Sequence, residues 1–258
     1  MSGAESSQAD LYLLTIARNM RSEDIVHIGA SQLEVWQAAE VARLLWAPGL
    51  RMVAAGSYHL STRLAGNPDL LCARTYGRDV VAGREATLSQ THVFNDLCRG
   101  RVVFSGALQV DVRGNGNLIG FESGSRYVRG PGSAGLPTLT SISERFFFVL
   151  PRHLKTVLVP QVHRISVLGD PAAREALRLP RDALREVITP LASFRSGPGG
   201  LRLTALSVGV TIEDVRRETG FDIQVAPDFI ERVPPSSDEL SALRYVRGDM
   251  NHRSSNER

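Results

Sequence analysis

The sequence predicts an α/β protein built on a parallel sheet with flanking helices. An apolar stretch, DIVHIGAS (24–31), has the character of a short buried strand, and LRMVAAGSY (50–58) is the next such stretch. A helical pattern (33–46) lies between them. A strand, a helix and a second strand in this order favour a right-handed crossover, which makes the two strands parallel. With 258 residues, 43% of them hydrophobic, the chain can form one large α/β domain or two small ones.

The first half of the chain predicts three helices. The first is expected over 8–21, where the apolar positions are Leu11, Leu14, Ile16 and Ala17. Ser31 is a suitable N-cap for the helix at 33–46, because a serine hydroxyl accepts from the free N–H groups of a first turn. The stretch 59–90 is less regular, and a third helix is expected near 91–98.

The second half predicts further strands and one capped helix. Strands are expected at 101–104, at the start of 106–120, at 145–151 and at 156–162. Residues 170–188 are polar and contain proline, so they are expected to form an excursion on the surface. Residues 201–226 predict a strand, a turn and a helix with Thr211 as its N-cap and Gly220 at its end. The expected organisation is an N-terminal helix region (1–22), a single α/β domain (23–245) and a polar C-terminal tail (246–258).

Composition excludes several classes of function. No apolar run approaches the roughly 18 residues that a membrane span needs, and the polar N-terminus does not resemble a secretory signal. The two cysteines, Cys72 and Cys98, form no CxxC pair and could not make a tetrahedral zinc site without histidines. We therefore expect a cytoplasmic protein with no membrane partner, no metal and no bound cofactor.

The basic balance of the chain comes from scattered arginines. The net charge is +3 and the pI is about 9.2, although Lys155 is the only lysine. A nucleic-acid-binding surface would cluster its basic residues and interleave aromatics, whereas here arginines alternate with acids, as in DVRRETGFD, and aromatics are 6%. We expect no nucleic-acid partner. Arginine suits an anionic small ligand equally well, because its planar fork pairs with phosphate or carboxylate.

Two glycine-rich stretches are candidates for a ligand site. The GNGN run (114–117) matches neither GxGxxG nor a P-loop, and taken alone it predicts a hairpin turn, since Asn and Gly accept positive φ. The second stretch, RGPGSAGLPT (129–138), could bring backbone N–H groups close to an oxyanion, or it could be a flexible connector. Arg126 and Arg129 are placed to pair with an anionic ligand, or simply with solvent.

Together the two stretches resemble a known family. GALQVDVRGNGN, followed by GPGSAG and a strand pair rich in Phe and Val, is similar to the β subunit of family I CoA-transferases, of the glutaconate CoA-transferase group. The late segment VGVTIEDVRRETGF (208–221) also matches, with Val208 where the family usually has proline. The resemblance covers about 24–245 with order and spacing kept.

The resemblance implies an open α/β fold of the NagB/RpiA-like type and an α-like partner subunit, in a heterodimer or heterotetramer. An acyl-CoA thioester would bind between the subunits as substrate. Residues of the family motif and of its glycine loop are then candidates for substrate or CoA binding: Gln109, Asn115, Asn117, Arg129, Gly130, Gly132 and Gly135. Gln109 and Asn115 are expected to hold the loop and to touch the acyl group, and Asp111 to be a turn acceptor rather than a base.

The chain departs from the family at its catalytic residue. Transferases that it resembles use a β-subunit glutamate, which forms an anhydride with the acyl group and a thioester with CoA. That glutamate is expected near Ala55 or Gly56, and neither can act as a nucleophile. Relatives without it decarboxylate acyl-CoAs with a cysteine at this place, or hydrolyse rings with a glutamate from the α subunit. Cys72 lies too far along the chain to match that cysteine and is expected to be a buried small residue.

Ser57 and His59 follow this gap and are the candidate catalytic residues. On an alternating strand they share a face, so Ser57 could donate a hydrogen bond while His59 acts as acid or base, or both could be polar rim residues. Ser31 and Gln32 follow the first strand, at the sheet edge where ligands of such folds collect, and could contact substrate.

Three functions remain open. The first is a heteromeric acyl-CoA enzyme that decarboxylates, hydrolyses or cleaves a C–C bond. The second is a true CoA-transferase whose glutamate lies elsewhere, and the third is a non-catalytic partner of an active α subunit.

Overall fold

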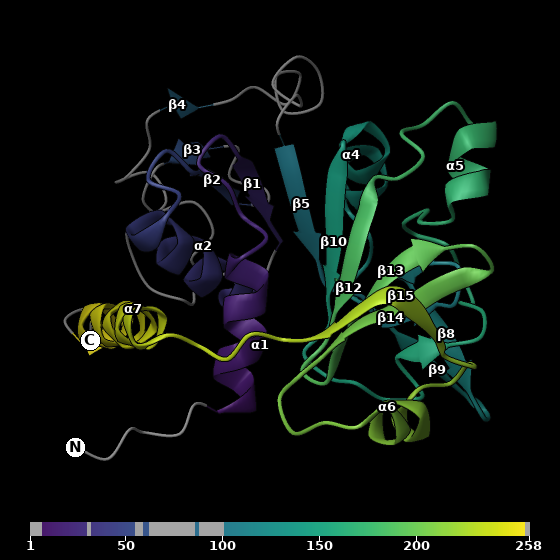
Figure 1. The fold of residues 1–258 in the computed structure, drawn as a ribbon. Helices are drawn as coiled ribbons and strands as arrows, with labels where there is room; N and C mark the ends of the chain where they lie inside the picture. The colour runs from purple at the N-terminus through teal and green to yellow at the C-terminus, as the bar shows by residue number, and fades with distance from the viewer. Residues whose placement is uncertain (1–6, 30–31, 55–58, 62–85, 88–100, 256–258) are drawn as a thin grey trace. The chain divides into compact units, whose positions relative to one another are not determined.

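The structure is a computed structural model and describes residues 7–29, 32–54, 59–61, 86–87 and 101–255 (Figure 1). Its contacts divide the chain into two compact units. The first unit combines Met1–Phe104 with Pro234–Arg258, and the second is Ser105–Val233. The first unit is therefore built from both ends of the chain.

The strands of the first unit form a parallel arrangement that turns antiparallel at one edge. They are β1 (Ile25–Ile28), β2 (Arg51–Ala54), β3 (His59–Ser61), β4 (Ala86–Thr87) and β5 (Arg101–Ser105), in the order β5-β1-β2-β3-β4. β1 is parallel to β2 and to β5, whereas β3 is antiparallel to both its neighbours. Every residue of β1 is buried, as expected for a strand covered on both faces. The predicted parallel α/β arrangement is confirmed.

Three helices complete the first unit: α1 (Gln8–Ala17), α2 (Leu33–Leu45) and α7 (Ser237–Ser255). Ser7 caps α1, and its side chain and that of Asp10 each accept from the other's backbone N–H. The N-cap of α2 is Gln32, so the prediction of Ser31 as N-cap was wrong by one residue; Ser31 itself lies outside the described residues. The helix predicted near 91–98 also lies outside them.

The C-terminal segment is a helix rather than the predicted polar tail. α7 extends to Ser255 and packs against α2 and α1. Its buried apolar residues, Ala242, Leu243 and Val246, recur at helical spacing among polar neighbours. Two ion pairs join α7 to the start of the chain, Arg18–Glu239 at 2.7 Å and Arg247–Asp10 at 2.6 Å.

The second unit has its own mixed set of strands. They are β10 (Arg145–Val149), β12 (Leu184–Ile188), β13 (Ala192–Gly197), β14 (Gly200–Leu206) and β15 (Gln224–Glu231), adjacent in this order. β10 is parallel to β12, and β14 to β15, while β13 is antiparallel to both its neighbours. Phe146, Phe148 and Phe194 lie fully buried here, and the first two rings pack edge to face at 5.8 Å.

The prediction of a surface excursion at 170–188 was wrong for its second half. After α5 (Pro171–Ala176), β12 lies between β10 and β13, and Leu184, Val187 and Ile188 are buried. Arg185 and Glu186 interrupt the apolar pattern of this strand, which concealed it in the sequence. The strands β13 and β15 were not predicted either.

Smaller elements carry the glycine-rich motifs. β6 (Gln109–Asp111), β7 (Gly116–Asn117) and β11 (Leu158–Val159) form a three-stranded sheet, and β8 (Gly120–Ser123) pairs with β9 (Arg126–Arg129). β6 and β7 are antiparallel, which confirms the hairpin turn predicted from GNGN. The helices α4 (Leu136–Ile142) and α6 (Ile212–Glu218) complete the unit, and Thr211 caps α6 as predicted.

Among the helices that the structure describes, none has the length and apolar character required to cross a membrane.

Candidate functional site

The Asp111 carboxylate closes the turn of the family motif. Its Oδ1 accepts from the backbone N–H groups of Arg113 at 3.0 Å and Asn115 at 2.9 Å. Its Oδ2 accepts from Asn115 Nδ2 at 3.3 Å and from the Val162 N–H at 3.4 Å. These donors occupy the acceptor positions of the carboxylate, so the prediction that Asp111 is an internal turn acceptor is confirmed.

Asn117 uses its complete hydrogen-bonding capacity inside the fold. Its Nδ2 donates to Gln109 Oε1 and to the Gly120 carbonyl, both at 2.9 Å. Its Oδ1 accepts from the N–H groups of Ile119 at 3.0 Å and Gly120 at 3.3 Å. Two donors and two acceptor positions are all that a carboxamide offers, and the residue is 0% exposed. Its contact with substrate stays a prediction and would require one of these bonds to break.

Asn115 and Gln109 hold the motif loop against neighbouring segments. Asn115 Oδ1 accepts from the N–H groups of Gly169 at 3.1 Å and Asp170 at 3.2 Å. Gln109 Oε1, besides its bond from Asn117, lies 3.3 Å from His163 Nδ1. Both side chains are buried. The predicted role in holding the loop is confirmed, whereas contact with an acyl group stays a prediction.

The motif glycines are explained by space and by backbone angle. Gly114 has φ +84°, which follows from its place in the turn after Asp111. A Cβ at Gly116 would overlap the Phe148 ring, so only glycine lets β7 approach this core side chain.

The second glycine-rich stretch is attached to the first. The N–H of Gly130 donates to the Ile119 carbonyl at 2.8 Å, and that of Gly132 to the Leu118 carbonyl at 3.0 Å. Gly135 is the N-cap of α4, and Arg129 is exposed on β9. The first two N–H groups thus bind within the fold, and the predicted contacts of this loop with CoA stay predictions.

The remaining candidates lie around the first unit's strands. Gln32 Oε1 accepts the Gly29 N–H at 2.8 Å, so its side chain closes the turn between β1 and α2. His59 begins β3, where it pairs with Thr87 of β4. Ser31 and Ser57 lie outside the described residues. The roles of Ser31, Gln32, Ser57 and His59 stay predictions.

The late family segment is structural, and sequence reasoning missed the histidine that it contacts. His153 Nε2 lies 2.9 Å from Thr219 Oγ1, and its Nδ1 lies 2.8 Å from Thr189 Oγ1. Burial, with the Arg232 charge, lowers the pKa of His153 to about 4. A Cβ at Gly220 would overlap the Leu158 carbonyl, and the Phe221 ring packs against Phe194 at 6.4 Å.

In the part of the chain that the structure describes, no group of three or more His, Cys, Asp and Glu residues is arranged to hold a metal ion. No protein-family model matches the chain. The curated relatives are more informative. The cholesterol ring-cleaving hydrolase IpdB subunit of Mycobacterium tuberculosis is 30% identical over 250 residues, which is 93% of this chain and 94% of that protein. The chain is a β-like member of the family I CoA-transferases.

Other members of the family support this assignment. One of the subunits of 3-oxoadipate CoA-transferase from Pseudomonas knackmussii is 26% identical over 250 residues, 93% of each chain. The β-like chain also has the fold of the decarboxylase AibA/AibB, with a TM-score of 0.79 at 25% identity over 96% of this chain and 98% of that one. Glutaconate CoA-transferase from Acidaminococcus fermentans shares the fold with a TM-score of 0.77 at 19% identity, covering 93% and 94% of the two chains. The family predicted from the two glycine-rich stretches is confirmed.

Proposed function

We propose that this chain is the β-like subunit of a heteromeric enzyme that acts on an acyl-CoA thioester by a reaction other than CoA transfer. The substrate is a CoA thioester, and the partner is an α-like subunit of the same family. Decarboxylation, hydrolysis and C–C cleavage are the reactions to be distinguished.

One observation carries the proposal: Ala55 and Gly56 stand where the family resemblance places the glutamate of a transferase. An Ala methyl group or a Gly hydrogen cannot attack a thioester, so the covalent glutamyl route needs a nucleophile that this position does not supply. The relatives support the same direction, since the group includes a protein named as a ring-cleaving hydrolase and one named as a decarboxylase. The reacting acid or base would then come partly from the α-like subunit.

A true CoA-transferase is the second candidate. Its support is the similarity to the 3-oxoadipate CoA-transferase chain, which extends over 93% of both proteins. This function requires a carboxylate from another segment to enter the cleft.

The test is a product analysis of the chain purified with its α-like partner. The complex is incubated with a panel of dicarboxylyl- and enoyl-CoA thioesters, with and without acetate, and mass spectrometry follows the products. We expect loss of CO2 or addition of water at rates independent of acetate. Formation of acetyl-CoA that depends on acetate would refute the proposal and establish the transferase. No product from any thioester, together with full activity of the α-like subunit alone, would instead identify a non-catalytic chain.

A further inference from the structure

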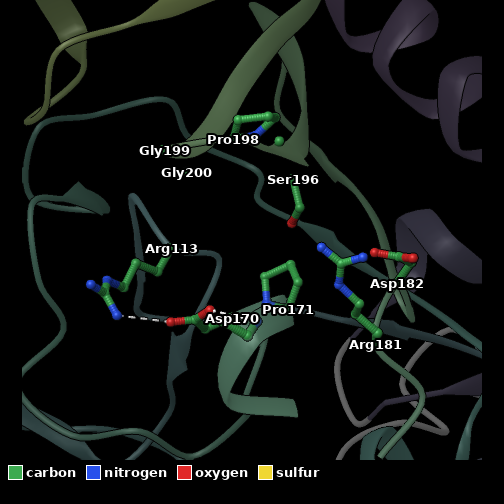
Figure 2. A pocket seen from close by; sticks show the side chains of 11 residues that line it. Arg113, Asp170, Pro171, Arg181, Asp182, Ser196, Pro198, Gly199 and Gly200 are labelled. Atoms are coloured by element: carbon green, nitrogen blue, oxygen red, sulfur yellow. Dashed lines mark hydrogen bonds and ion pairs between the residues drawn. The ribbon is translucent and has the colours of Figure 1, made fainter. Parts of the chain in front are cut away.

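A polar cavity lies in the second unit, beside the family motif. Its volume is about 590 Å³, which is in the range of sites for small metabolites (Figure 2). Arg113, from the motif turn, and Asp170 form one side of it, and Arg181 and Asp182 form the other. The turn of the β13–β14 hairpin, 196–200, contributes the remaining wall. None of these residues belongs to the predicted acyl-CoA site.

The motif itself builds this cavity. Asn115 Oδ1 binds the N–H of Asp170, and the Asp170 carboxylate accepts from Arg113 Nη1 at 2.9 Å and from the Ala172 N–H at 3.0 Å. These contacts fix the position of the Arg113 guanidinium. Its side chain is 71% exposed, and a guanidinium has five N–H donors, so the bond to Asp170 leaves donors for a ligand.

Arg181 is held less tightly than Arg113. Its Nε lies 3.6 Å from Glu175 Oε2, longer than a hydrogen bond, and its side chain is 60% exposed. Such a loose surface ion pair contributes little to stability, so the guanidinium can turn to a better anion at small cost. The aspartates Asp170 and Asp182 balance the two arginines in formal charge. Directed donors rather than overall charge must therefore select the ligand.

Ser196 supplies a second kind of donor at the same cavity. Its Oγ is buried, and within the described part of the chain it has no hydrogen-bond partner. A buried hydroxyl without a partner is unfavourable by about 1–3 kcal/mol, so such groups usually meet water or a ligand. The hydroxyl lies close to Gly114, since a Cβ built on that glycine would be 3.7 Å from it.

We infer that this cavity binds the phosphoryl group of a small organic molecule through Arg181, Arg113 and Ser196. Guanidinium forks match phosphate oxygens, and the serine hydroxyl donates a further hydrogen bond. The cavity is much larger than an inorganic ion, and Pro171 and Pro198 provide apolar surface for the rest of the molecule. The phosphoryl group could belong to a free phosphate ester or to coenzyme A. In the second case the inference rests on the proposed function.

The experiment measures equilibrium binding to the purified complex by calorimetry, without turnover. The probes are inorganic phosphate, coenzyme A and 3′-dephospho-coenzyme A. The variants are Arg181→Gln and Ser196→Ala, and the matched control is Arg195→Gln. Arg195 precedes Ser196 on β13, pairs with Asp228 at 2.8 Å and does not line the cavity.

We expect phosphate to bind about ten-fold more weakly to Arg181→Gln and about three-fold more weakly to Ser196→Ala, while Arg195→Gln keeps wild-type affinity. Ser196→Ala should keep the thermal stability of the ligand-free protein, because it removes a hydroxyl that has no partner within the described part of the chain. If coenzyme A, but not its dephospho form, weakens in the same variants, the phosphoryl group is the 3′-phosphate of coenzyme A. If only phosphate weakens, the ligand is a free phosphate ester.

Equal weakening in all three variants would mean that phosphate responds to general surface charge, and the inference would be overturned. Wild-type affinity in Arg181→Gln and Ser196→Ala would overturn it as well. Neither result would bear on the acyl-CoA reaction, since activity is measured separately.

Discussion

The Nε2 atom of His27 lies 2.7 Å from Arg101 Nη1, between the neighbouring strands β1 and β5. The two residues are only 5% and 2% exposed. Because a guanidinium can only donate, the imidazole nitrogen that faces it must be an unprotonated acceptor. Burial, together with the Arg101 charge, lowers the pKa of His27 to about 3.

This pair predicts a loss of stability in mild acid. In the unfolded chain a histidine titrates near ~6.5, so below that pH the unfolded state gains a proton that folded His27 refuses down to about pH 3. The stabilisation is complete above about pH 6.5 and falls by roughly 1.4 kcal/mol for each pH unit below it. Urea unfolding at pH 7, 6 and 5 should show about 2 kcal/mol less of this decline in His27→Gln than in wild type by pH 5.

The substitution His27→Gln keeps an acceptor for Arg101 and removes the titration. His153, whose pKa is also lowered, supplies a residual slope in the variant. Identical slopes for wild type and variant would show that His27 is not the source of the acid sensitivity.

Asn117→Asp should destabilise the second unit. The substitution replaces the Nδ2 donor with an oxygen that faces the Gln109 Oε1 and Gly120 carbonyl acceptors, in a site that is 0% exposed. We expect a loss of about 2–4 kcal/mol in the free energy of unfolding. Gln224→Glu, the same chemical change at an exposed residue of β15, should stay within about 0.5 kcal/mol of wild type. A comparable loss in both variants would argue against the closed network around Asn117.

The glycines of the second stretch should differ in their tolerance of alanine. At Gly130 a Cβ would overlap the Leu118 carbonyl, which belongs to a backbone that cannot move aside, so Gly130→Ala should lose more than about 2 kcal/mol. At Gly132 the Cβ would meet open space and only the φ of +87° is unfavourable, so Gly132→Ala should lose about 1 kcal/mol. Thermal unfolding of the two variants side by side measures the difference, and the reverse order would contradict this account of the loop.

The predicted catalytic residues give a test in turnover. If Ser57 and His59 act on substrate, Ser57→Ala and His59→Gln should each lower kcat about 100-fold or more at unchanged stability. The histidine variant should also lose the acid limb of the pH–rate profile, since that limb reports the titration of the group. Full turnover in both variants would exclude a catalytic role for this pair and favour catalysis from the α-like subunit.

The sequence predicted the elements whose signal is local. The apolar runs of β1, β5 and β10 are continuous, and Thr211 with Asp214 makes a capping box that can be read from four consecutive residues. β12 and α7 were missed because their apolar residues are few and gain meaning only from their packing partners. The motif gave the family, but not the inward direction of the Gln109, Asn115 and Asn117 side chains. Their burial depends on contacts with Asp170, Val162 and Ser166, which lie far along the chain.

The division of the first unit between the two ends of the chain has a consequence for biosynthesis. Residues 105–233 leave the ribosome as one uninterrupted segment and can fold while translation continues. The first unit must wait for α7, because that helix packs on α2 and its Arg247 and Glu239 bind Asp10 and Arg18. Its N-terminal helices therefore spend most of synthesis with an uncovered apolar face. We expect this half of the protein to be the one that engages chaperones during translation.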